Sequence, residues 1–434
     1  MNKLVDWMTA WMIKVQQKSF YYVLRKTVII LFPFVLIGSF AKAVNRGLLV
    51  KNGFGGQVLR IYKWLPYCSK FQKFFASLEF LTLGLIAVLA AYQSARYTAK
   101  LYGKDDQIAG ITGMLSFLLI FSARLSAPNL AATNWLFKMQ GVLLGLVVGY
   151  IVGQLFRVFG HGRNYEVVEP IMHRSFAAFP PILAAFFVAS VGMAITWAFN
   201  RMQLGEILTD ALQNSEGGKH EFLITTVLTV VNSILGWLGL NGPMPYRSAI
   251  NSDAFYDNLE SALKHNSAWY VPHKYTDYTL FHSFAHLGGM GCALALVIAI
   301  ALVSHHHSTN MLGIWSLFPV AFNINGPLLI GLPLLLNPLY IVPIILAPLA
   351  NVLIAGSLIA LKIIPPSVFV VPPGTPGPLI SFIGTNGNVG SLIVSLLLLA
   401  LDVLIYIPFV RVSDGVYDRL EKRKRKELGN NGKA

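Results

Sequence analysis

The chain has 434 residues, of which 55% are hydrophobic and only 12% are charged. Soluble domains carry about 25% charged residues, so this composition excludes an ordinary soluble protein and predicts a polytopic membrane protein. The formal charge of +15 is not interpreted as a nucleic-acid footprint, because basic residues gather at the flanks of membrane spans. The two cysteines, Cys68 and Cys292, allow at most one disulfide.

The chain begins with an amphipathic segment, residues 4–20. One helical face of this segment carries Leu4, Trp7, Met8, Trp11, Met12 and Val15. Such a helix either lies at the membrane surface, with its tryptophans among the lipid headgroups, or packs on the protein's own cytoplasmic face. No apolar core with a small-residue cleavage site occurs in the first 26 residues, so we expect no cleavable signal peptide.

Apolar runs that are long enough to cross a bilayer, which takes about 20 residues, then recur along the chain. The predicted spans are 27–44, 78–97, 107–123, 140–158, 176–198, 222–240, 284–303, 339–361 and 389–410. Their basic flanks predict that both termini are cytoplasmic, although the basic loop 46–75 disobeys the alternation. Segment 241–283 is too polar to span and is either a re-entrant hairpin or an external cap.

Segment Ala321–Pro338 is apolar yet interrupted by Gly326, Pro327, Gly331, Pro333 and Pro338, and it carries Asn323, Asn325 and Asn337. Proline and glycine break helices, and irregular backbone survives at membrane depth only where it is buried in protein or lines a wet cavity. Transporters usually hold their substrate at such discontinuous segments. The alternative is a polar loop between two helices.

A second polar break lies at residues 236–247, GWLGLNGPMPYR. Trp237 offers an aromatic plane for the apolar face of a sugar ring, and Asn241 offers an amide for its hydroxyls. Together with Asn323 and Asn325, this break predicts an uncharged sugar site. The alternative is a helix end that is capped by Asn241.

The histidines have two interpretations. His282 and His286, spaced four apart, form either a ligand site or a proton relay, unless neighbouring amides simply satisfy them. His305-His306-His307 is interpreted as a solvated loop after a span rather than a metal site. We therefore expect no metal and no other cofactor. The absence of a GxxxxGK[ST] motif predicts that the chain does not hydrolyse ATP.

Several motifs, in order along the chain, resemble the membrane permease component (enzyme IIC, EIIC) of the bacterial sugar phosphotransferase system, lactose/cellobiose (diacetylchitobiose) family. They are PFVLIGSF (33–40), VVEPIMHRSFAAFPP (167–181), WLGLNG (237–242), HLGGMG (286–291), FPVAFNINGPLLIGLPLLLNP (318–338), IILAPLANVLIA (344–355) and YIPF (406–409). The resemblance implies an all-α fold with about ten transmembrane helices and two re-entrant hairpins, in a homodimer. It also implies a cytoplasmic enzyme IIB that phosphorylates the sugar during import.

Two departures from the family motifs concern its chemistry. Asn241 stands where the family has a histidine, and Gly326 stands where its FNINEP motif has a sugar-contacting glutamate. An imidazole or a carboxylate can accept a proton from the reacting hydroxyl, whereas an asparagine is a poor base and a glycine has no side chain. We therefore name no catalytic residue and no independent enzymatic activity. The predicted substrate-binding residues are Trp237, Asn241, His286, Asn323 and Asn325.

These patterns predict four segments in the bacterial cytoplasmic membrane. They are an interfacial helix (1–26), a helical dimerisation domain (27–220), a substrate-binding domain with the re-entrant hairpins (221–410) and a basic cytoplasmic tail (411–434). The first hypothesis for the function is a permease for a β-linked disaccharide or oligosaccharide. The second is a transport-inactive membrane sensor that signals through a partner or a downstream domain. The third is an uncoupled facilitator, an exporter or a receptor surface.

Overall fold

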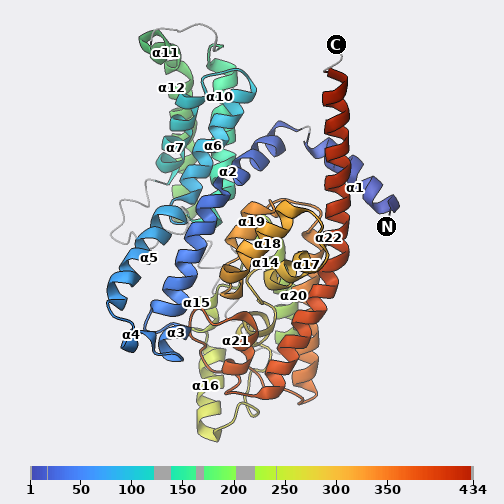
Figure 1. The fold of residues 1–434 in the computed structure, drawn as a ribbon. Coiled ribbons are helices and arrows are strands. Elements are labelled where there is room, and N and C mark those ends of the chain that lie inside the picture. Colours follow the sequence, from blue (N-terminus) through green and yellow to red (C-terminus); the bar gives the residue numbers. More distant parts are fainter. Residues whose placement is uncertain are drawn as a thin grey trace. The chain divides into compact units, whose positions relative to one another are not determined.

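The computed structural model describes residues 2–16, 18–121, 138–162, 171–201, 220–240 and 242–431. Every regular element in these ranges is a helix, as the sequence predicts (Figure 1). The helical segments that are long and apolar enough to cross a membrane are Ser19–Gln57, Cys68–Leu101, Met139–Phe159, Arg174–Ala198, Ile341–Ala360 and Val389–Lys422. Shorter apolar helices cover Asp106–Ile120, Glu221–Trp237 and Ala293–Val303. The count of about ten spans with two re-entrant hairpins stays a prediction.

The described chain forms two compact units. The smaller unit contains residues 14–38 and 79–206, and the larger unit contains residues 1–13, 39–78 and 207–434. The helices of the smaller unit are α2 (Ser19–Lys42, to residue 38), α6 (Ile86–Leu101), α7 (Asp106–Ile120), η2 (Met139–Gly141), α10 (Val142–Phe159), α11 (Ile171–Ala177) and α12 (Phe179–Arg201).

The smaller unit is organised by close packing of α6 on α10. Gly145 and Gly149 lie against the backbone oxygens of Ala87 and Ala91, so closely that a Cβ atom at either glycine would overlap them. Gly153 packs in the same way against the Thr98 side chain. This GxxxGxxxG spacing puts small residues on one helix face, which lets two helices approach closely without a hydrophobic driving force between them.

The larger unit contains the remaining elements. They are α1 (Asn2–Gln16, to residue 13), η1 (Ala43–Leu49), α3 (Phe54–Gln57), α4 (Ile61–Trp64), α5 (Cys68–Thr82, to residue 78), α14 (Glu221–Trp237), α15 (Tyr246–Ala249), α16 (Asp253–His265), η3 (Tyr278–His282), α17 (Ala293–Val303), α18 (His307–Ala321), α19 (Gly326–Gly331), α20 (Ile341–Ala360), α21 (Gly377–Gly384) and α22 (Val389–Asn431).

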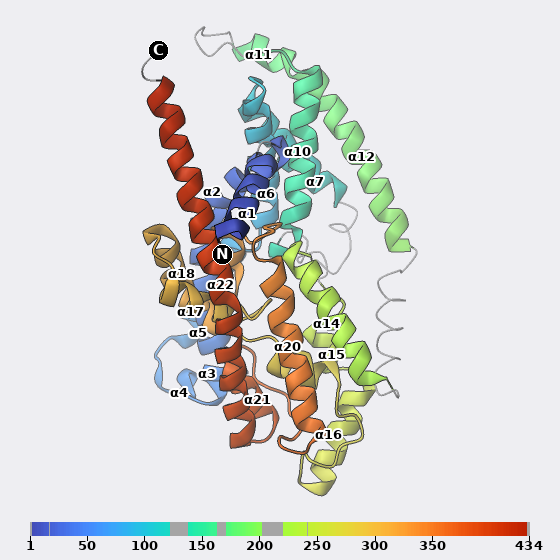
Figure 2. The same ribbon diagram turned by 90° about the vertical axis from the view of Figure 1, so that its right-hand side faces the viewer.

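Helix α22 is the long element of the larger unit, and α17, α20 and α21 pack along it (Figure 2). The helix passes Pro408 without ending and continues to Asn431, so the predicted span 389–410 and the first part of the predicted tail form one helix. Near its far end Arg419 pairs with Asp6 of α1. This ion pair favours the interpretation of the N-terminal segment as a helix packed on the protein itself.

Two predicted spans are interrupted in the structure. The predicted span 284–303 becomes helical only from Ala293, because Gly288, Gly289 and Gly291 all have positive φ angles that a helix cannot contain. The predicted span 78–97 is divided between α5, which ends at Thr82, and α6, which begins at Ile86.

The packing of α6 on α10 generates a prediction. Gly149→Val places a branched side chain against the Ala91 backbone, so we expect the free energy of unfolding to fall by about 1–3 kcal/mol, as overpacking does. Thermal unfolding in detergent measures the change. Val147→Leu, on the exposed side of the same helix, is the matched control and should leave the unfolding midpoint unchanged. Equal midpoints for the two variants would contradict close packing at Gly149.

Candidate functional site

Three broken segments of the larger unit are joined by one side-chain amide. Asn323 accepts a hydrogen bond from the Gly288 backbone N–H at 2.9 Å through Oδ1, and it donates to the Thr375 backbone oxygen at 2.9 Å through Nδ2. The amide thus links FNIN (322–325), HLGGMG (286–291) and the VPPGTPGP loop (371–378). Asn323 itself has φ +62°, a left-handed conformation that asparagine tolerates better than most residues. These hydrogen bonds indicate that Asn323 positions the site.

The loop 286–291 has glycine at the positions where other residues approach its backbone closely. Gly288 has φ +81°, and a Cβ atom there would overlap Leu294. Gly289 has φ +100°, and its position is covered by Asn325, whose Cγ would lie 3.1 Å from an added Cβ. The glycine run therefore allows both the turn and the close approach of FNIN.

Asn325 is the residue with the amide best placed to meet a ligand. It precedes α19, and it is only half-buried. Its side chain makes no hydrogen bond within the described residues, in contrast to that of Asn323. An amide offers two donors and an acceptor with two lone pairs, so Asn325 can hydrogen-bond two hydroxyls of one ligand.

Trp237 is the last residue of α14, and it is held against the C-terminal part of the broken segment Ala321–Pro338. Its indole Nε1–H donates to the Asn337 backbone oxygen at 2.9 Å, and its own backbone oxygen accepts from Leu336 N–H at 3.2 Å. The preceding Gly236 packs against the Met290 side chain. The structure thus brings the two predicted polar breaks together and places Trp237, half-buried, beside the glycine loop.

The histidine pair does not share a helix face. His282 ends η3, whereas His286 lies beyond it in the loop, with the two ring centroids 6.1 Å apart. His282 is buried, and burial lowers its pKa to about 3, so it remains neutral at physiological pH. His286 is half-buried, and its Nδ1 has no hydrogen-bond partner among the described residues. Its ring is therefore the second candidate group for a ligand.

Of the two positions that depart from the family motifs, the structure describes only Gly326. Gly326 begins α19 and is buried, so this position has no side chain to reach a ligand. Asn241 lies outside the described residues, and its role stays a prediction.

The neighbouring loop that contains Thr375 is held by two tyrosines. Tyr278 donates to the Phe369 backbone oxygen at 2.6 Å and accepts from the Val371 N–H at 3.2 Å. Tyr246 contributes a further hydrogen bond, to the Val371 backbone oxygen at 3.2 Å. These contacts hold the loop that presents Thr375 to Asn323.

The sequence interpretation missed a buried polar group beneath the loop 286–291. Asn351 of α20 donates to Asp402 of α22 at 2.8 Å and to the Phe284 backbone oxygen at 3.2 Å. Tyr406, one helical turn from Asp402, donates to the Gly291 backbone oxygen at 2.5 Å. These residues position both ends of the loop. The signal was available, because Asp402 is the only acidic residue in the predicted span 389–410 and an acid in a span is rarely incidental.

The groups that remain for a ligand are therefore the amide of Asn325, the imidazole of His286 and the indole face of Trp237. They supply hydrogen-bond donors, acceptors and an aromatic plane, and none carries a charge when the imidazole is neutral. This chemistry suits a neutral ligand with several hydroxyl groups.

The chain was compared with known families, proteins and solved structures. The family model for "Phosphotransferase system, EIIC" matches residues 25–348. The oligo-beta-mannoside-specific EIIC component of Bacillus subtilis is 23% identical over 95% of this chain and 93% of the relative. The lactose-specific EIICB component of Staphylococcus epidermidis is 23% identical over 99% of this chain and 73% of the relative. The solved structure of the N,N'-diacetylchitobiose transporter ChbC aligns with 94% of this chain and 96% of its own, at 21% identity and a TM-score of 0.43.

The Asn351–Asp402 pair generates a prediction. Asn351→Ala removes the amide that donates to the buried Asp402 carboxyl and to the Phe284 backbone oxygen, so we expect the protein to lose about 1–3 kcal/mol of stability. Thermal unfolding in detergent is the measurement. The matched control on the same helix is Ser357→Ala, because Ser357 is exposed and bonds only the backbone of its own helix. If both variants unfold at the same temperature, the pair does not support the loop.

Proposed function

The chain belongs to the EIIC family of the bacterial sugar phosphotransferase system, and from this membership we propose that it binds a β-linked disaccharide or oligosaccharide and carries it across the membrane. The membrane setting is supported by the apolar helices of both units. The class of sugar is supported by the names of the relatives, which are specific for oligo-β-mannosides and lactose.

One observation carries the proposal of a binding site. In the glycine loop 286–291, Gly289 lies against Asn325 and Met290 packs on Gly236. Gly236 is the neighbour of Trp237 in the sequence. Residues that lie far apart in the sequence are thereby gathered around one short loop. In this arrangement Asn325 and His286 hydrogen-bond sugar hydroxyls, and the Trp237 ring packs on the apolar face of a sugar ring.

The proposal assigns Asn323 a positioning role, since both polar ends of its amide are already bonded within the protein. Asn241 is proposed to contact the ligand as an amide. Neither Asn241 nor Gly326 can act as a base, so any phosphorylation of the bound sugar relies on the partner and on other side chains.

We further propose the partners and the setting that a permease of this kind requires. They are a cytoplasmic enzyme IIB, a second copy of the chain in a homodimer, the lipids of the bacterial cytoplasmic membrane, and cytoplasmic positions for both termini. No observation favours the sensor over the permease, because the reported relatives are named as transport-system components.

The binding proposal is tested at Asn325. Asn325→Ala removes hydrogen bonds to buried sugar hydroxyls, so we expect binding of cellobiose to weaken by about 1–3 kcal/mol, roughly 5- to 150-fold in Kd. Titration calorimetry on the purified protein in detergent measures it. Asn251→Ala, which removes an exposed amide on the same unit, should leave the Kd unchanged. An unaltered Kd in Asn325→Ala would remove Asn325 from the site.

Transport is tested separately from binding. Membrane vesicles that contain the chain should accumulate labelled cellobiose as sugar phosphate when the phosphoryl-donor proteins are supplied inside. Tight binding without uptake would contradict the permease and support the sensor. The double variant Asn241→His with Gly326→Glu restores an acid–base pair, so we expect phosphorylation-linked uptake to increase. No increase would mean that the chain lacks more than these two side chains.

A further inference from the structure

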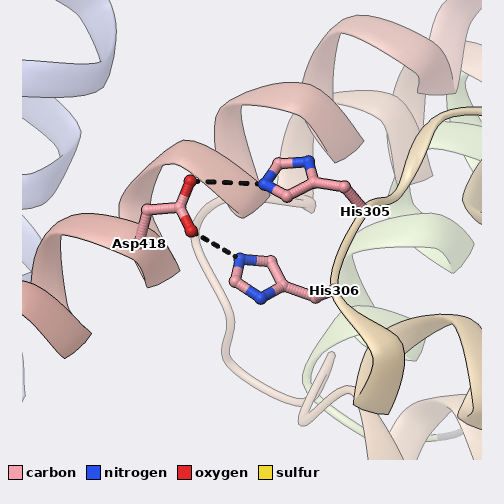
Figure 3. A group of neighbouring side chains, drawn as sticks. All are labelled: His305, His306 and Asp418. Atoms are coloured by element: carbon pink, nitrogen blue, oxygen red, sulfur yellow. Dashed lines mark hydrogen bonds and ion pairs between the residues drawn. The ribbon is translucent and has the colours of Figure 1, made fainter.

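Two of the three consecutive histidines after α17 contact a carboxylate of a distant helix. The structure brings His305 and His306 to Asp418 of α22, 113 residues after His305 (Figure 3). One ligand atom from each of these side chains lies within 4.8 Å of the others. We propose that His305, His306 and Asp418 form a binding site for a divalent transition-metal ion of the zinc class.

The three side chains lie close enough together to bind one metal ion. His305 Nε2 lies 3.3 Å from Asp418 Oδ2, and His306 Nε2 lies 3.2 Å from Asp418 Oδ1. Charge-assisted N–H···O bonds are shorter, about 2.7–2.9 Å. Two ligands of a tetrahedral zinc, each 2.0–2.1 Å from the ion, are about 3.3–3.4 Å apart. Each imidazole lies near this distance from one oxygen of Asp418, and the three ligand atoms, which lie within 4.8 Å of one another, would move closer together around the ion.

A buried carboxylate supports the first ligand. Asp414 is buried at 1% exposure, and it accepts hydrogen bonds from the Ser304 hydroxyl at 3.2 Å and from the His305 backbone N–H at 3.1 Å. Its Oδ2 also lies 3.2 Å from His305 Nδ1. A histidine that binds a metal usually donates its other ring N–H to a carboxylate, which fixes the ring and leaves the second nitrogen free for the ion. The Asp414 carboxylate lies close enough to His305 Nδ1 to take this role when the ion is bound.

His306, the second ligand, binds the ion only after the proton on its ring moves from Nε2 to Nδ1. His306 Nε2 lies 3.3 Å from the Asp414 backbone oxygen as well as near Asp418. Binding therefore requires the tautomer with its proton on Nδ1, and the ion replaces that backbone contact. Because the tautomers of neutral imidazole differ little in energy, this rearrangement does not prevent binding.

The donor set and its surroundings select the metal. Two imidazoles and a carboxylate suit zinc and its neighbours, whereas magnesium and calcium prefer oxygen ligands only. The carboxylates of Asp414 and Asp418 balance the two positive charges of the ion. The His305 side chain is 62% exposed and that of Asp418 is 42% exposed, so the ion enters from solvent and water completes its coordination.

The site lies where it can restrain the fold. His305 and His306 immediately precede α18, whose other end leads into Asn323 and Asn325, while Asp418 belongs to α22. The ion therefore fastens the start of α18 to α22. This inference does not depend on the proposed sugar or on transport.

The experiment uses the full chain, purified in detergent without a polyhistidine tag, since such a tag would itself bind zinc. Competition with a chromophoric chelator measures zinc affinity, and X-ray absorption on the zinc-loaded protein counts imidazole ligands. We expect one zinc per chain with two imidazoles. His305→Ala and Asp418→Asn should each abolish this binding, and Asp414→Asn should weaken it about 10- to 100-fold.

The control is His307→Ala, because His307 is the exposed neighbour in the same run and is not one of the ligands. It should retain the affinity of the unaltered protein. Equal affinity in His305→Ala, loss of binding in His307→Ala, or fewer than two imidazoles around zinc in the unaltered protein would overturn the site. The last measurement needs no variant, so it stands even if a substitution prevents folding.

Discussion

The larger unit depends on the amide of Asn323. Its oxygen bonds the glycine loop 286–291 and its nitrogen bonds the loop at Thr375, so one side chain joins three broken segments. Backbone that leaves a helix inside a membrane protein must find its hydrogen bonds within the protein. Asn323 satisfies one donor and one acceptor of this kind, and glycine lets the segments approach. This constraint explains why breakers and amides occur together in an otherwise apolar stretch.

Polar side chains on regular helices also provide hydrogen-bond partners for the irregular backbone of the loop 286–291. Asn351 and Tyr406 project from α20 and α22 and bond the backbone at the two ends of the loop 286–291, and Asn351 also bonds the buried Asp402. The irregular loop is therefore held by rigid elements. Asn325, His286 and Trp237 are left at its edge with donors, acceptors and a ring face. In the proposed site these groups are held before a ligand arrives, so binding would not have to order them.

Much of the fold was predictable because its signals are local. The apolar runs at 140–158, 339–361 and 389–410 coincide with α10, α20 and the first half of α22. The turn that delays α17 to Ala293 was not predicted, although its cause, the run Gly288-Gly289-Met290-Gly291, is visible in the sequence. Hydropathy averages over a window, and positive φ angles at single glycines do not change that average. Helix α22 extends beyond its apolar half because its polar half is also a good helix former.

The sequence by itself determined that the chain is a helical membrane protein and which of its segments are broken. It also indicated which side chains were candidates for a sugar, since composition, hydropathy and motif order are properties of neighbouring residues. Only the tertiary structure decided how these side chains are used. It bonds Asn323 within the protein and leaves Asn325 free, it separates His286 from the helix of His282, and it brings Asp418 to His305 and His306. Hydrogen bonds and ligand geometries are set by atoms from segments far apart in the chain, so residue spacing alone could not show them.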